Sequence, residues 1–430
     1  MSEPSPSVPS GITVEYVPID SLRPASYNPR KWTPEEAAKL MESMKRFGMI
    51  EPLIVNQHPD RMNVIVGGHF RWAVAKESKF ETIPVVYVYL PLEKEKELNL
   101  RLNRNTGQWD FEILKDLGID LLLDVGFDNQ DLSDIWDSSL ETDEDDFSVE
   151  KELAKIQTPT TKPGDIFALG THRLLCGDST DLNVVSRLMN GELADMIYCD
   201  PPFNIGLSYH EGISTSGKYG GKKTNDRLSF VEYRSFLAKT MKNALASAKP
   251  DCHVFYWCDE NYVGLLQGLF AEHALTNKRT CLWVKNNFNL TPGVAFNKAY
   301  EPCVYAIRGK PYLDEKVRNL NEVMNKEIGI GNRAMEDIEE LFDIWLAKRL
   351  AGQDYEHPTE KPPTLHEKPL RRCTKINDLV LDLFGGSGST LIACEQMKRR
   401  CFTVELEPIF CDLIIKRYES LTGTKAKLLN

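Results

Sequence analysis

Hydrophobic and polar positions in the first 136 residues follow two different periods. Three short runs rich in Val and Ile predict strands, at residues 53–55, 63–66 and 85–89. From residue 34 to 47, apolar side chains recur every three or four positions, which is typical of a helix with one buried face. Thr33 and Glu36 form a capping box at its start, and Gly48 ends it. The pattern predicts a small α+β domain at residues 14–136, whose last part, from residue 98, is helical.

The second half of the chain alternates strand-like and helix-like segments. Residues 196–199 are an apolar run that ends at Asp200, and residues 379–383 are a second run that leads into a glycine-rich turn. A helix is predicted over residues 390–398 and a strand over residues 401–405. Because strands alternate with helices, we expect an α/β fold with a mostly parallel, doubly wound sheet that carries helices on both faces.

Charge is concentrated in one segment. Residues 106–150 contain 1 basic and 15 acidic side chains, whereas residues 1–105 carry a net charge of +1 and residues 151–430 carry +2. The total of −11 therefore says little about what the longer region binds, and a nucleic-acid partner stays open. The acidic run predicts a solvated linker at residues 137–162, between the first domain and a second domain at residues 163–430.

Composition narrows the class of protein further. With 42% hydrophobic and 27% charged residues among 430, the chain is neither disordered nor fibrous. It has no apolar stretch long enough to span a membrane and no signal-peptide pattern, so we expect a cytoplasmic protein without a membrane partner. All ten cysteines lie between Cys176 and Cys411 without a CxxC pair, which predicts reduced, buried thiols and no metal site.

Three glycines separate a predicted strand from the next helix in the sequence LDLFGGSGST, at residues 381–390. Glycine tolerates positive φ and lets the backbone approach a ligand closely. Glu405 ends the following strand, 23 residues after Asp382, where an acid can bind the two ribose hydroxyls of an adenosine cofactor. The turn departs from G-x-G-x-x-G, which favours a small adenosine cofactor over a dinucleotide. A purely structural turn is the alternative.

The first apolar run leads into Asp200, Pro201, Pro202 and Phe203. Proline fixes φ and lacks an N–H group, so this loop is stiff and presents carbonyl oxygens. The Asp200 carboxylate and a proline carbonyl can each accept a hydrogen from an amino group, and Phe203 can stack on a flat ring. The alternative interpretation is a strand-ending turn with a core phenylalanine.

Together these segments resemble the DNA amino-methyltransferase family, which transfers methyl from S-adenosyl-L-methionine to adenine N6 or cytosine N4. The catalytic motif comes before the cofactor motif, as in the β class of that family. The resemblance implies a Rossmann-like methyltransferase domain in which Asp200, Pro201, Pro202 and Phe203 are catalytic. It implies cofactor-binding roles for Asp178, Thr359, Lys361, Asp382, Phe384, Gly385, Gly386, Ser387, Gly388 and Glu405.

Smaller matches support the same resemblance. Thr359 and Lys361 lie in HPTEKP, which resembles the β-class segment that helps to hold the methionine carboxylate. Asp178 lies in a Cys-Gly-Asp element similar to the one that reaches the adenine of the cofactor. Lys285 and Glu301 fall where two later family motifs stand, although Tyr300 replaces the usual histidine.

The family chemistry explains these residue types. An exocyclic amine on a base is a weak nucleophile, because its lone pair is delocalised into the ring. Accepting both of its hydrogens favours the pyramidal, reactive amine, which must then face the methyl group in line. This geometry is out of reach inside a duplex, so the base is flipped out. Asp rather than Ser at position 200 resembles the adenine-modifying members. We therefore expect adenine N6 as the target, with cytosine N4 as the alternative.

Two further segments are candidates for DNA contact. Residues 308–352 fall where β-class members have their target-recognition segment. Basic side chains in this region that could meet phosphates are Arg308, Lys310, Lys316, Arg318, Lys326 and Arg333. Residues 218–223 form a glycine-rich basic loop that could close over DNA. Acidic residues are interleaved in the first region, for which a helical insertion is the alternative, and a disordered, solvated loop is the alternative for residues 218–223.

The N-terminal segment resembles the ParB/sulfiredoxin-like domain, on residues 16–24, 28–30 and 64–71. It contains no cysteine, which argues against sulfiredoxin chemistry, and His69 replaces a glutamate of the partition-type motif, which argues against CTP hydrolysis. Arg71 and the neighbouring glycines could still hold a phosphate. We expect this domain to bind DNA, a nucleotide or a partner protein. A nuclease role has no metal-ligand cluster to support it.

The expected partners follow from the resemblance. They are S-adenosyl-L-methionine as cofactor, double-stranded DNA as substrate, and a second copy of the chain, since many β-class members dimerise. The competing hypothesis is a binding module, in which the ParB-like domain carries the function and the C-terminal domain only senses the cofactor. The intact motifs at residues 200–203 and 382–388 favour the enzyme.

Overall fold

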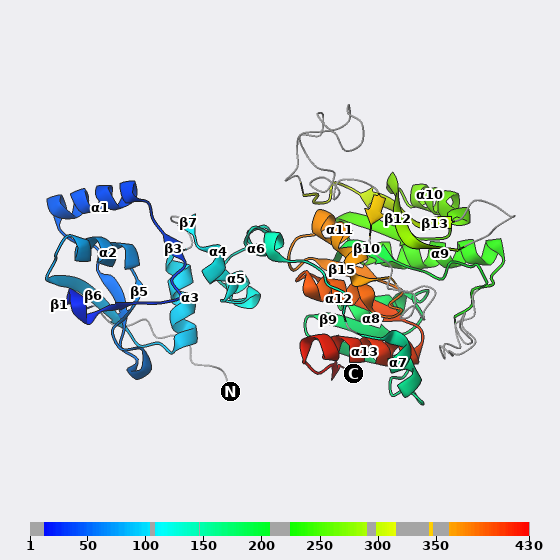
Figure 1. The fold of residues 1–430 in the computed structure, drawn as a ribbon, viewed down its shortest axis with the longest axis horizontal. Helices are drawn as coiled ribbons and strands as arrows, with labels where there is room; N and C mark the ends of the chain where they lie inside the picture. The colour runs from blue at the N-terminus through cyan, green and yellow to red at the C-terminus, as the bar shows by residue number, and fades with distance from the viewer. Residues whose placement is uncertain are drawn as a thin grey trace, which may run out of the picture. The chain divides into compact units, whose positions relative to one another are not determined.

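The computed structural model describes residues 13–103, 108–145, 147–206, 224–289, 298–314, 344–346 and 361–429. The chain forms two compact units, Met1–Ser138 and Ser139–Asn430, and each has its own main sheet (Figure 1). Within the described residues, no helix is long and apolar enough to cross a membrane.

A five-stranded sheet with the strand order β1-β6-β4-β5-β2 forms the base of the N-terminal unit. Its strands are β1 (Glu15–Pro18), β2 (Arg23–Pro24), β4 (Leu53–Asn56), β5 (Val64–Gly67) and β6 (Thr82–Val88), and a separate pair joins β3 (Arg30–Lys31) to β7 (Gln108–Trp109). The three strands predicted from the sequence are confirmed as β4, β5 and β6. Their apolar side chains form a core with Met44 of α1 (Pro34–Phe47) and Val74 of α2 (His69–Glu77).

Local signals set the helices of this unit. The capping box predicted at α1 is present, because Thr33 accepts from the Glu36 N–H and Glu36 accepts from the Thr33 N–H. The predicted helical extension is confirmed as helical but is divided into α3 (Leu92–Asn103), α4 (Phe111–Lys115), α5 (Ile119–Asp124) and α6 (Asn129–Trp136). Gly118 and Gly126 adopt positive φ between these helices, which ends one and starts the next. Short 3-10 turns occur at Ile19–Ser21, Pro59–Arg61 and Asp137–Ser139.

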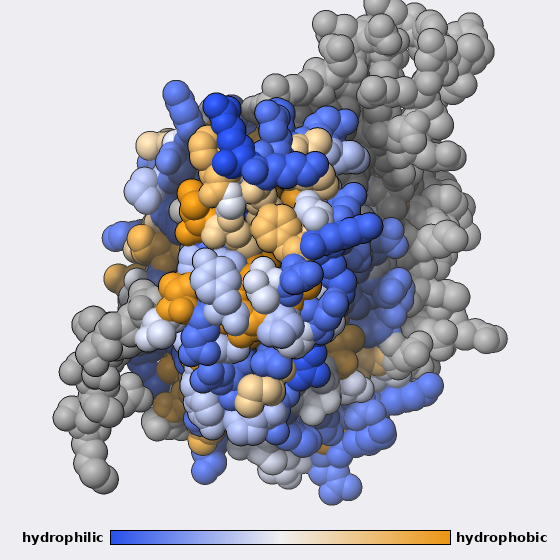
Figure 2. Space-filling model, turned by 90° about the vertical axis from the view of Figure 1, so that its left-hand side faces the viewer, coloured by the Kyte–Doolittle hydropathy of each residue, from blue (hydrophilic) through white to orange (hydrophobic). Residues whose placement is uncertain are grey.

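The N-terminal unit exposes several large hydrophobic side chains. Tyr16, Phe47, Ile50 and Tyr89 are each more than 60% exposed. Figure 2 shows hydrophobic residues gathered on one face of this unit, surrounded by hydrophilic ones.

The C-terminal unit contains a ten-stranded sheet with the order β14-β12-β13-β11-β10-β15-β16-β9-β8-β17. Its strands are β8 (Ile166–Leu169), β9 (His172–Cys176), β10 (Ala194–Cys199), β11 (Ala248–Trp257), β12 (Thr276–Asn289), β13 (Lys298–Arg308), β14 (Ile344–Leu346), β15 (Leu379–Asp382), β16 (Arg400–Glu405) and β17 (Lys427–Leu428). Parallel pairing runs from β11 through β10, β15 and β16 to β9, and antiparallel pairs lie towards both ends.

The register at the centre of the sheet brings the two predicted loops together. Met196 of β10 pairs with Val380 of β15, and Ile197 pairs with Leu381, in parallel. Both strands therefore end at the same edge, where the ligands of open α/β sheets bind. The strands predicted before the two motifs, and the strand that ends at Glu405, are confirmed as β10, β15 and β16.

Helices cover both faces of this sheet, as the fold class predicted (Figure 1). Successive side chains of a strand point to opposite faces, so Ile197 belongs to one hydrophobic cluster and Tyr198 to the other. The first cluster includes α8 (Leu182–Met189), α9 (Phe230–Ala246) and α10 (Val263–Glu272), and the second includes α11 (Pro363–Cys373), α12 (Ser389–Gln396) and α13 (Pro408–Thr422). All ten cysteines are buried, as predicted.

The part of the acidic segment that follows Ser138 belongs to the C-terminal unit and packs on its helices. We call residues 139–145 and 147–161 the strap. Val149 and Leu153 of its helix α7 (Val149–Lys155) are buried against Phe410 and Leu413 of α13. The sequence suggested a solvated linker here, and the structure adds contacts that charge patterning alone did not indicate.

Candidate active site

A cavity of about 280 Å³ lies where β10 and β15 end. It is lined by two loops, which we name by their residues: the DPPF loop (residues 200–203) and the glycine turn (residues 384–388). Residues from α9, from the end of β16 and from the start of α11 also line it, as do residues 177–180 after β9 and Phe410 of α13. Two segments that are more than 180 residues apart in the chain therefore share one cavity.

Neighbouring side chains hold the DPPF loop in place. The Tyr233 hydroxyl donates to the Pro202 carbonyl at 2.8 Å, and Phe203 is only 8% exposed. The next residue, Asn204, has a φ of +57°, a left-handed conformation that asparagine tolerates better than most residues. Its N–H donates to the Asp226 carboxylate at 2.6 Å. These contacts fix the direction in which the chain leaves β10, and hence the position of Asp200.

Lys361 lies behind the DPPF loop in a buried, charged cluster. Its Nζ is 2.5 Å from Oδ2 of Asp200 and 3.7 Å from Oε2 of Glu301, and its side chain is 3% exposed. The ammonium also faces the rings of Trp257, at 4.7 Å, and Phe203, at 5.1 Å. Burial acts to lower the pKa of Lys361, but the two carboxylates outweigh it and raise that pKa above its ordinary value. Lys361 is thus a fixed positive charge.

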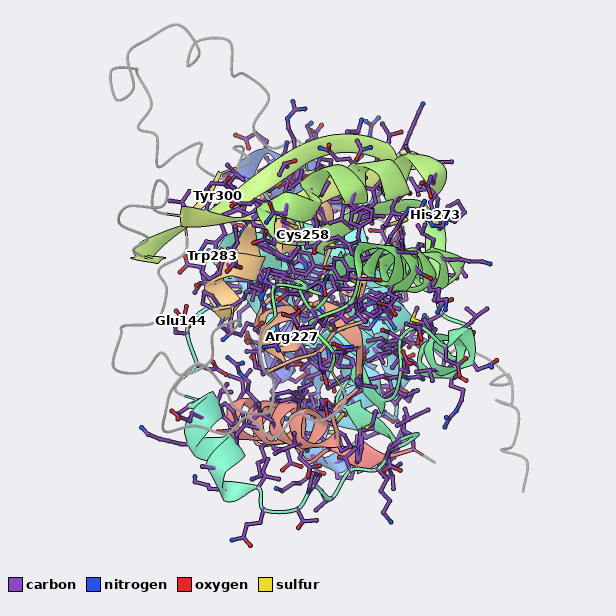
Figure 3. The ribbon with its side chains drawn as sticks, turned by 90° about the vertical axis from the view of Figure 1, so that its right-hand side faces the viewer. Glu144, Arg227, Cys258, His273, Trp283 and Tyr300 are labelled. Atoms are coloured by element: carbon purple, nitrogen blue, oxygen red, sulfur yellow. The ribbon has the colours of Figure 1, made fainter. Side chains whose placement is uncertain are left out.

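Aromatic rings pack around this charge. Trp257 meets Trp283 of β12 and Trp345 of β14 edge to face, with ring centroids 6.4 and 5.5 Å apart. Figure 3 labels Trp283 on β12 and Tyr300 on the neighbouring strand β13. Trp283 and Trp345 thus pack behind Trp257, and the low exposure of Lys361 strengthens its attraction to Asp200.

The glycine turn is shaped by hydrogen bonds to β16. The Gly385 N–H donates to the Val404 carbonyl at 2.9 Å. Gly386 has a φ of +51°, and its N–H donates to Oε2 of Glu405 at 2.8 Å. The Glu407 N–H donates to Oε1 of the same carboxyl at 2.8 Å. Burial raises the pKa of Glu405 to about 7, although these two N–H groups oppose the shift.

Asp382 lies beneath the glycine turn. It is 3% exposed and accepts the Phe384 N–H at 2.9 Å. Burial raises the pKa of Asp382 well above its ordinary value, and the nearby Asp200 carboxylate adds to that rise. Gly388, at a φ of +86°, is the residue from which α12 begins. Asp382 and Gly388 therefore shape the turn rather than line the cavity.

A series of hydrogen bonds through His366 borders the cavity. His366 of α11 contacts the Tyr198 hydroxyl through Nδ1 and the Ser389 hydroxyl through Nε2, both at 3.0 Å. Burial lowers the pKa of His366 to about 3, and the positive charges of Lys361 and Arg417 contribute. The imidazole is therefore neutral at physiological pH, and it links the strand below the DPPF loop to the helix after the glycine turn.

Most of the predicted site residues meet in this cavity. They are Asp178, Asp200, Pro201, Pro202, Phe203, Lys361, Phe384, Gly385, Gly386, Ser387 and Glu405. Asp178 is exposed at the rim and accepts the Thr180 N–H at 2.8 Å. Thr359 lies outside the described residues, as do the basic loop at residues 218–223 and Lys316, Arg318, Lys326 and Arg333.

One candidate phosphate contact is wrong. The guanidinium of Arg308 donates to the backbone carbonyls of Leu245, Ala248 and Lys249. These carbonyls lie at the end of α9 and the start of β11, where the chain needs donors. Arg308 is therefore committed to the fold and is not available to DNA.

The sequence did not single out Tyr233, Trp257, His366 or Arg417. Each lies inside an ordinary apolar or amphipathic element, so no spacing marks it. Glu301 and Lys361 were each noted in the sequence through resemblance to different family motifs, and nothing in the sequence paired them.

The cavity fits an adenosine cofactor with a charged tail. At Gly386, an added Cβ would meet no atom closer than 3.9 Å, so the turn presents open backbone to the cavity. The Glu405 carboxyl lies directly behind this turn, where it can accept ribose hydroxyls. Phe236, Phe384, Leu406 and Phe410 supply an apolar lining for a base.

Comparisons with known proteins agree with this geometry. Residues 194–416, more than half of the chain, match the family model described as DNA methylase, and the chain belongs to that family. It is an S-adenosyl-L-methionine-dependent DNA methyltransferase of the N6/N4 type. Residues 5–106 match the ParB N-terminal domain.

Individual relatives are distant. The chain is 27% identical over 247 residues to the Type II methyltransferase M2.DpnII of Streptococcus pneumoniae. This alignment covers 55% of this chain and 86% of that protein. It is 32% identical over 75 residues to the ParB-like nuclease domain-containing protein YnaK of Escherichia coli, covering 17% of this chain and 82% of that one. The solved PvuII DNA methyltransferase (cytosine-N4-specific) aligns with a TM-score of 0.41 and 16% identity, over 62% of this chain and 98% of that one.

Proposed function

We propose that this enzyme methylates the exocyclic N6 amine of adenine in a base flipped out of double-stranded DNA. The observation that carries the proposal is Asp200. Asp200 directly follows β10, its side chain is 28% exposed, and it lines the same cavity as the glycine turn. An aspartate at this position resembles the adenine-modifying members of the family, whereas serine is the other residue found there.

Each residue of the DPPF loop has a role in this proposal. The Asp200 carboxylate and the Pro201 carbonyl accept the two hydrogens of the amine, which directs its lone pair at the cavity. Phe203 offers its ring to the extruded base, and such stacking is worth about 1–3 kcal/mol per base. Lys361 keeps Asp200 oriented and favours its charged form. Bound S-adenosyl-L-methionine supplies the electrophilic methyl group.

Residues around the glycine turn hold the cofactor in this proposal. Glu405 accepts the ribose hydroxyls, Asp178 reaches the adenine edge, and the backbone at Gly386 contacts the tail. Lys361 is already paired with Asp200, so the methionine carboxylate has to be held mainly by other groups, with Thr359 as the candidate from the sequence.

Mass spectrometry of nucleosides from DNA methylated in vitro tests the target base. We expect N6-methyladenine and no N4-methylcytosine. N4-methylcytosine as the product would replace the proposal with the alternative. Cofactor binding without turnover on any DNA would favour the binding-module hypothesis.

The N-terminal unit has a separate proposed role. We propose that the ParB-like domain binds DNA, a nucleotide or a partner protein and so recruits the methyltransferase. Burial lowers the pKa of His69 to about 4, and His69 accepts the Ala25 N–H through Nε2 at 3.1 Å, which supports a structural role for this residue. DNA affinity of the full chain, compared with a chain lacking residues 1–138, tests recruitment. Equal affinities would contradict a contribution to DNA binding.

A further inference from the structure

The strap lies between the two segments that match known families, and neither match includes it. It nevertheless reaches the cofactor site through one arginine. Arg417 of α13 is 2% exposed, and it binds Asp145 of the strap with two parallel hydrogen bonds, Nε to Oδ2 at 2.5 Å and Nη2 to Oδ1 at 2.6 Å. Its remaining nitrogen, Nη1, donates to both the carbonyl and the hydroxyl of Ser387 at 3.1 Å.

Ser387 belongs to the glycine turn and lines the cavity. Its neighbours Gly386 and Gly388 have positive φ, so this stretch has few steric constraints of its own. A planar guanidinium held by a bidentate carboxylate is a rigid donor. Asp145 therefore directs Arg417 towards Ser387, and Arg417 adds to the hydrogen bonds with β16 that place the glycine turn.

Other contacts hold the strap in register on the same helices. Glu367 of α11 accepts from both the backbone N–H and the hydroxyl of Thr142, at 2.7 Å each. Thr364 donates to Glu144 at 2.7 Å, and Gln396 of α12 donates to the Asp143 carbonyl at 3.0 Å. Figure 3 labels Glu144 on this segment. The strap is thus bound to α11, α12 and α13.

We propose that Asp145 is a positioning residue for the cofactor, which acts through Arg417 to hold the glycine turn in its binding conformation. The methyltransferase domain then begins functionally at the strap. One acidic residue of the strap, Asp145, forms a buried ion pair, and the neighbouring acidic residues contribute charge at the surface.

The test compares Asp145→Asn with two control variants. Glu141→Gln removes one negative charge from the same segment, at an exposed side chain. Thr142→Val removes the hydroxyl that donates to Glu367 and so loosens the strap on α11, at residues that are not part of the pair of Asp145 and Arg417 or of the cavity lining. Calorimetry measures S-adenosyl-L-methionine binding for each, and hydrogen exchange reports on residues 385–389 in the cofactor-free protein.

For Asp145→Asn, we expect cofactor affinity to fall about tenfold, which is 1.4 kcal/mol, and exchange in the glycine turn to accelerate. At saturating cofactor, kcat should stay close to that of the wild type, because the DPPF loop is untouched. Glu141→Gln should match the wild type, and Thr142→Val should lower thermal stability without this specific loss of affinity.

Two results overturn the proposal. One is wild-type affinity in Asp145→Asn, and the other is an equal loss in Thr142→Val, which would mean that general stability of the strap is responsible. If Asp145→Asn does not fold, Asp145→Glu decides. Its longer carboxyl displaces the guanidinium but keeps the charge, so unchanged affinity in that variant rejects the role. Because cofactor binding is measured without DNA, this outcome is independent of which base is methylated.

Discussion

The ammonium of Lys361 lies 2.5 Å from a carboxylate oxygen of Asp200, in a cluster that Glu301 and Trp257 close off from solvent. The family resemblance suggested that Lys361 helps to hold the methionine carboxylate of the cofactor. Its position also makes it the partner of the residue expected to accept a hydrogen from the target amine. We therefore expect the charge on Lys361 to affect methyl transfer, whether or not the ammonium also contacts the cofactor.

Replacing Asp200 should separate transfer from cofactor binding. We expect Asp200→Ala to lower the methylation rate at least about 100-fold, as when one preorganised hydrogen-bonding group is removed from an active site. Cofactor affinity should change little, because Glu405 and the glycine turn are intact. Methyl incorporation into DNA measures the methylation rate, and calorimetry measures cofactor affinity. A variant that still labels DNA at a near-normal rate would show that the reaction centre lies elsewhere.

Lys361→Met tests the buried charge. Without the ammonium, no positive charge from position 361 offsets the carboxylates of Asp382 and Glu301. Asp200 should therefore lose its proton less readily. We expect the rising limb of the pH–rate profile to move to higher pH and the rate at neutral pH to fall. Lys239→Met, at an exposed position of α9, is the matched control and should keep the wild-type profile. Superimposable profiles for the two variants would speak against the role of Lys361.

Glu405 predicts a pH dependence of cofactor binding. Its pKa is raised from 4.5 to about 7, and the ionised carboxyl is the better acceptor of hydroxyl hydrogens. We therefore expect cofactor affinity to increase as the pH rises from 6 to 8. Glu405→Gln should bind more weakly at pH 8 and lack this part of the trend. Titration calorimetry at several pH values measures the cofactor affinity of both proteins. Parallel curves of affinity against pH would show that Glu405 is not the titrating group.

The same carboxyl predicts a trend in stability. A group whose pKa is higher in the folded state stabilises the protein fully below its unfolded pKa, and this contribution is lost as pH rises through the folded value. For Glu405 the window runs from about pH 4.5 to about 7. We expect Glu405→Gln to remove a decline in the thermal midpoint of the C-terminal unit across that window. Calorimetric melting of both proteins at pH 5 and pH 7 provides the comparison.

Gly385 is expected to tolerate no side chain. A Cβ there would lie 2.8 Å from Oγ1 of Thr403 and 3.0 Å from Cδ1 of Ile414. Overpacking of this kind costs about 1–3 kcal/mol, so Gly385→Ala should lower the calorimetric melting temperature. Gly268→Ala, in α10, meets no atom within 4 Å and should raise stability by roughly 0.5–1 kcal/mol. Equal melting temperatures for the two variants would contradict the packing argument.

Local signals in the sequence were enough for the strands that lead into the site. Asp200 and Glu405 each follow an apolar run, and the ends of parallel strands meet at one edge, so their approach follows from the pattern. The capping box at Thr33 is equally local, and it was found for the same reason.

Contacts between distant segments were not predictable in this way. Asp145 and Arg417 are 272 residues apart, and Lys361 and Asp200 are 161 apart. No periodicity encodes such a pair, because each residue lies in a segment whose own pattern is complete without it. The prediction for Arg308 failed for a related reason. The sequence shows a basic side chain but not the carbonyls of the distant residues to which its guanidinium donates.

The position of β15 and β16 between β10 and β9 has a consequence for biosynthesis. These two strands come from the last quarter of the chain, yet they fill the middle of the sheet. Until they emerge from the ribosome, β10 and β9 have open hydrogen-bonding edges, and such pairing across long sequence separations is slow. The nascent protein therefore carries its DPPF motif for about 200 residues of synthesis, until Glu405 has been added, before a methyl donor can bind, which delays DNA modification until the whole polypeptide is nearly finished.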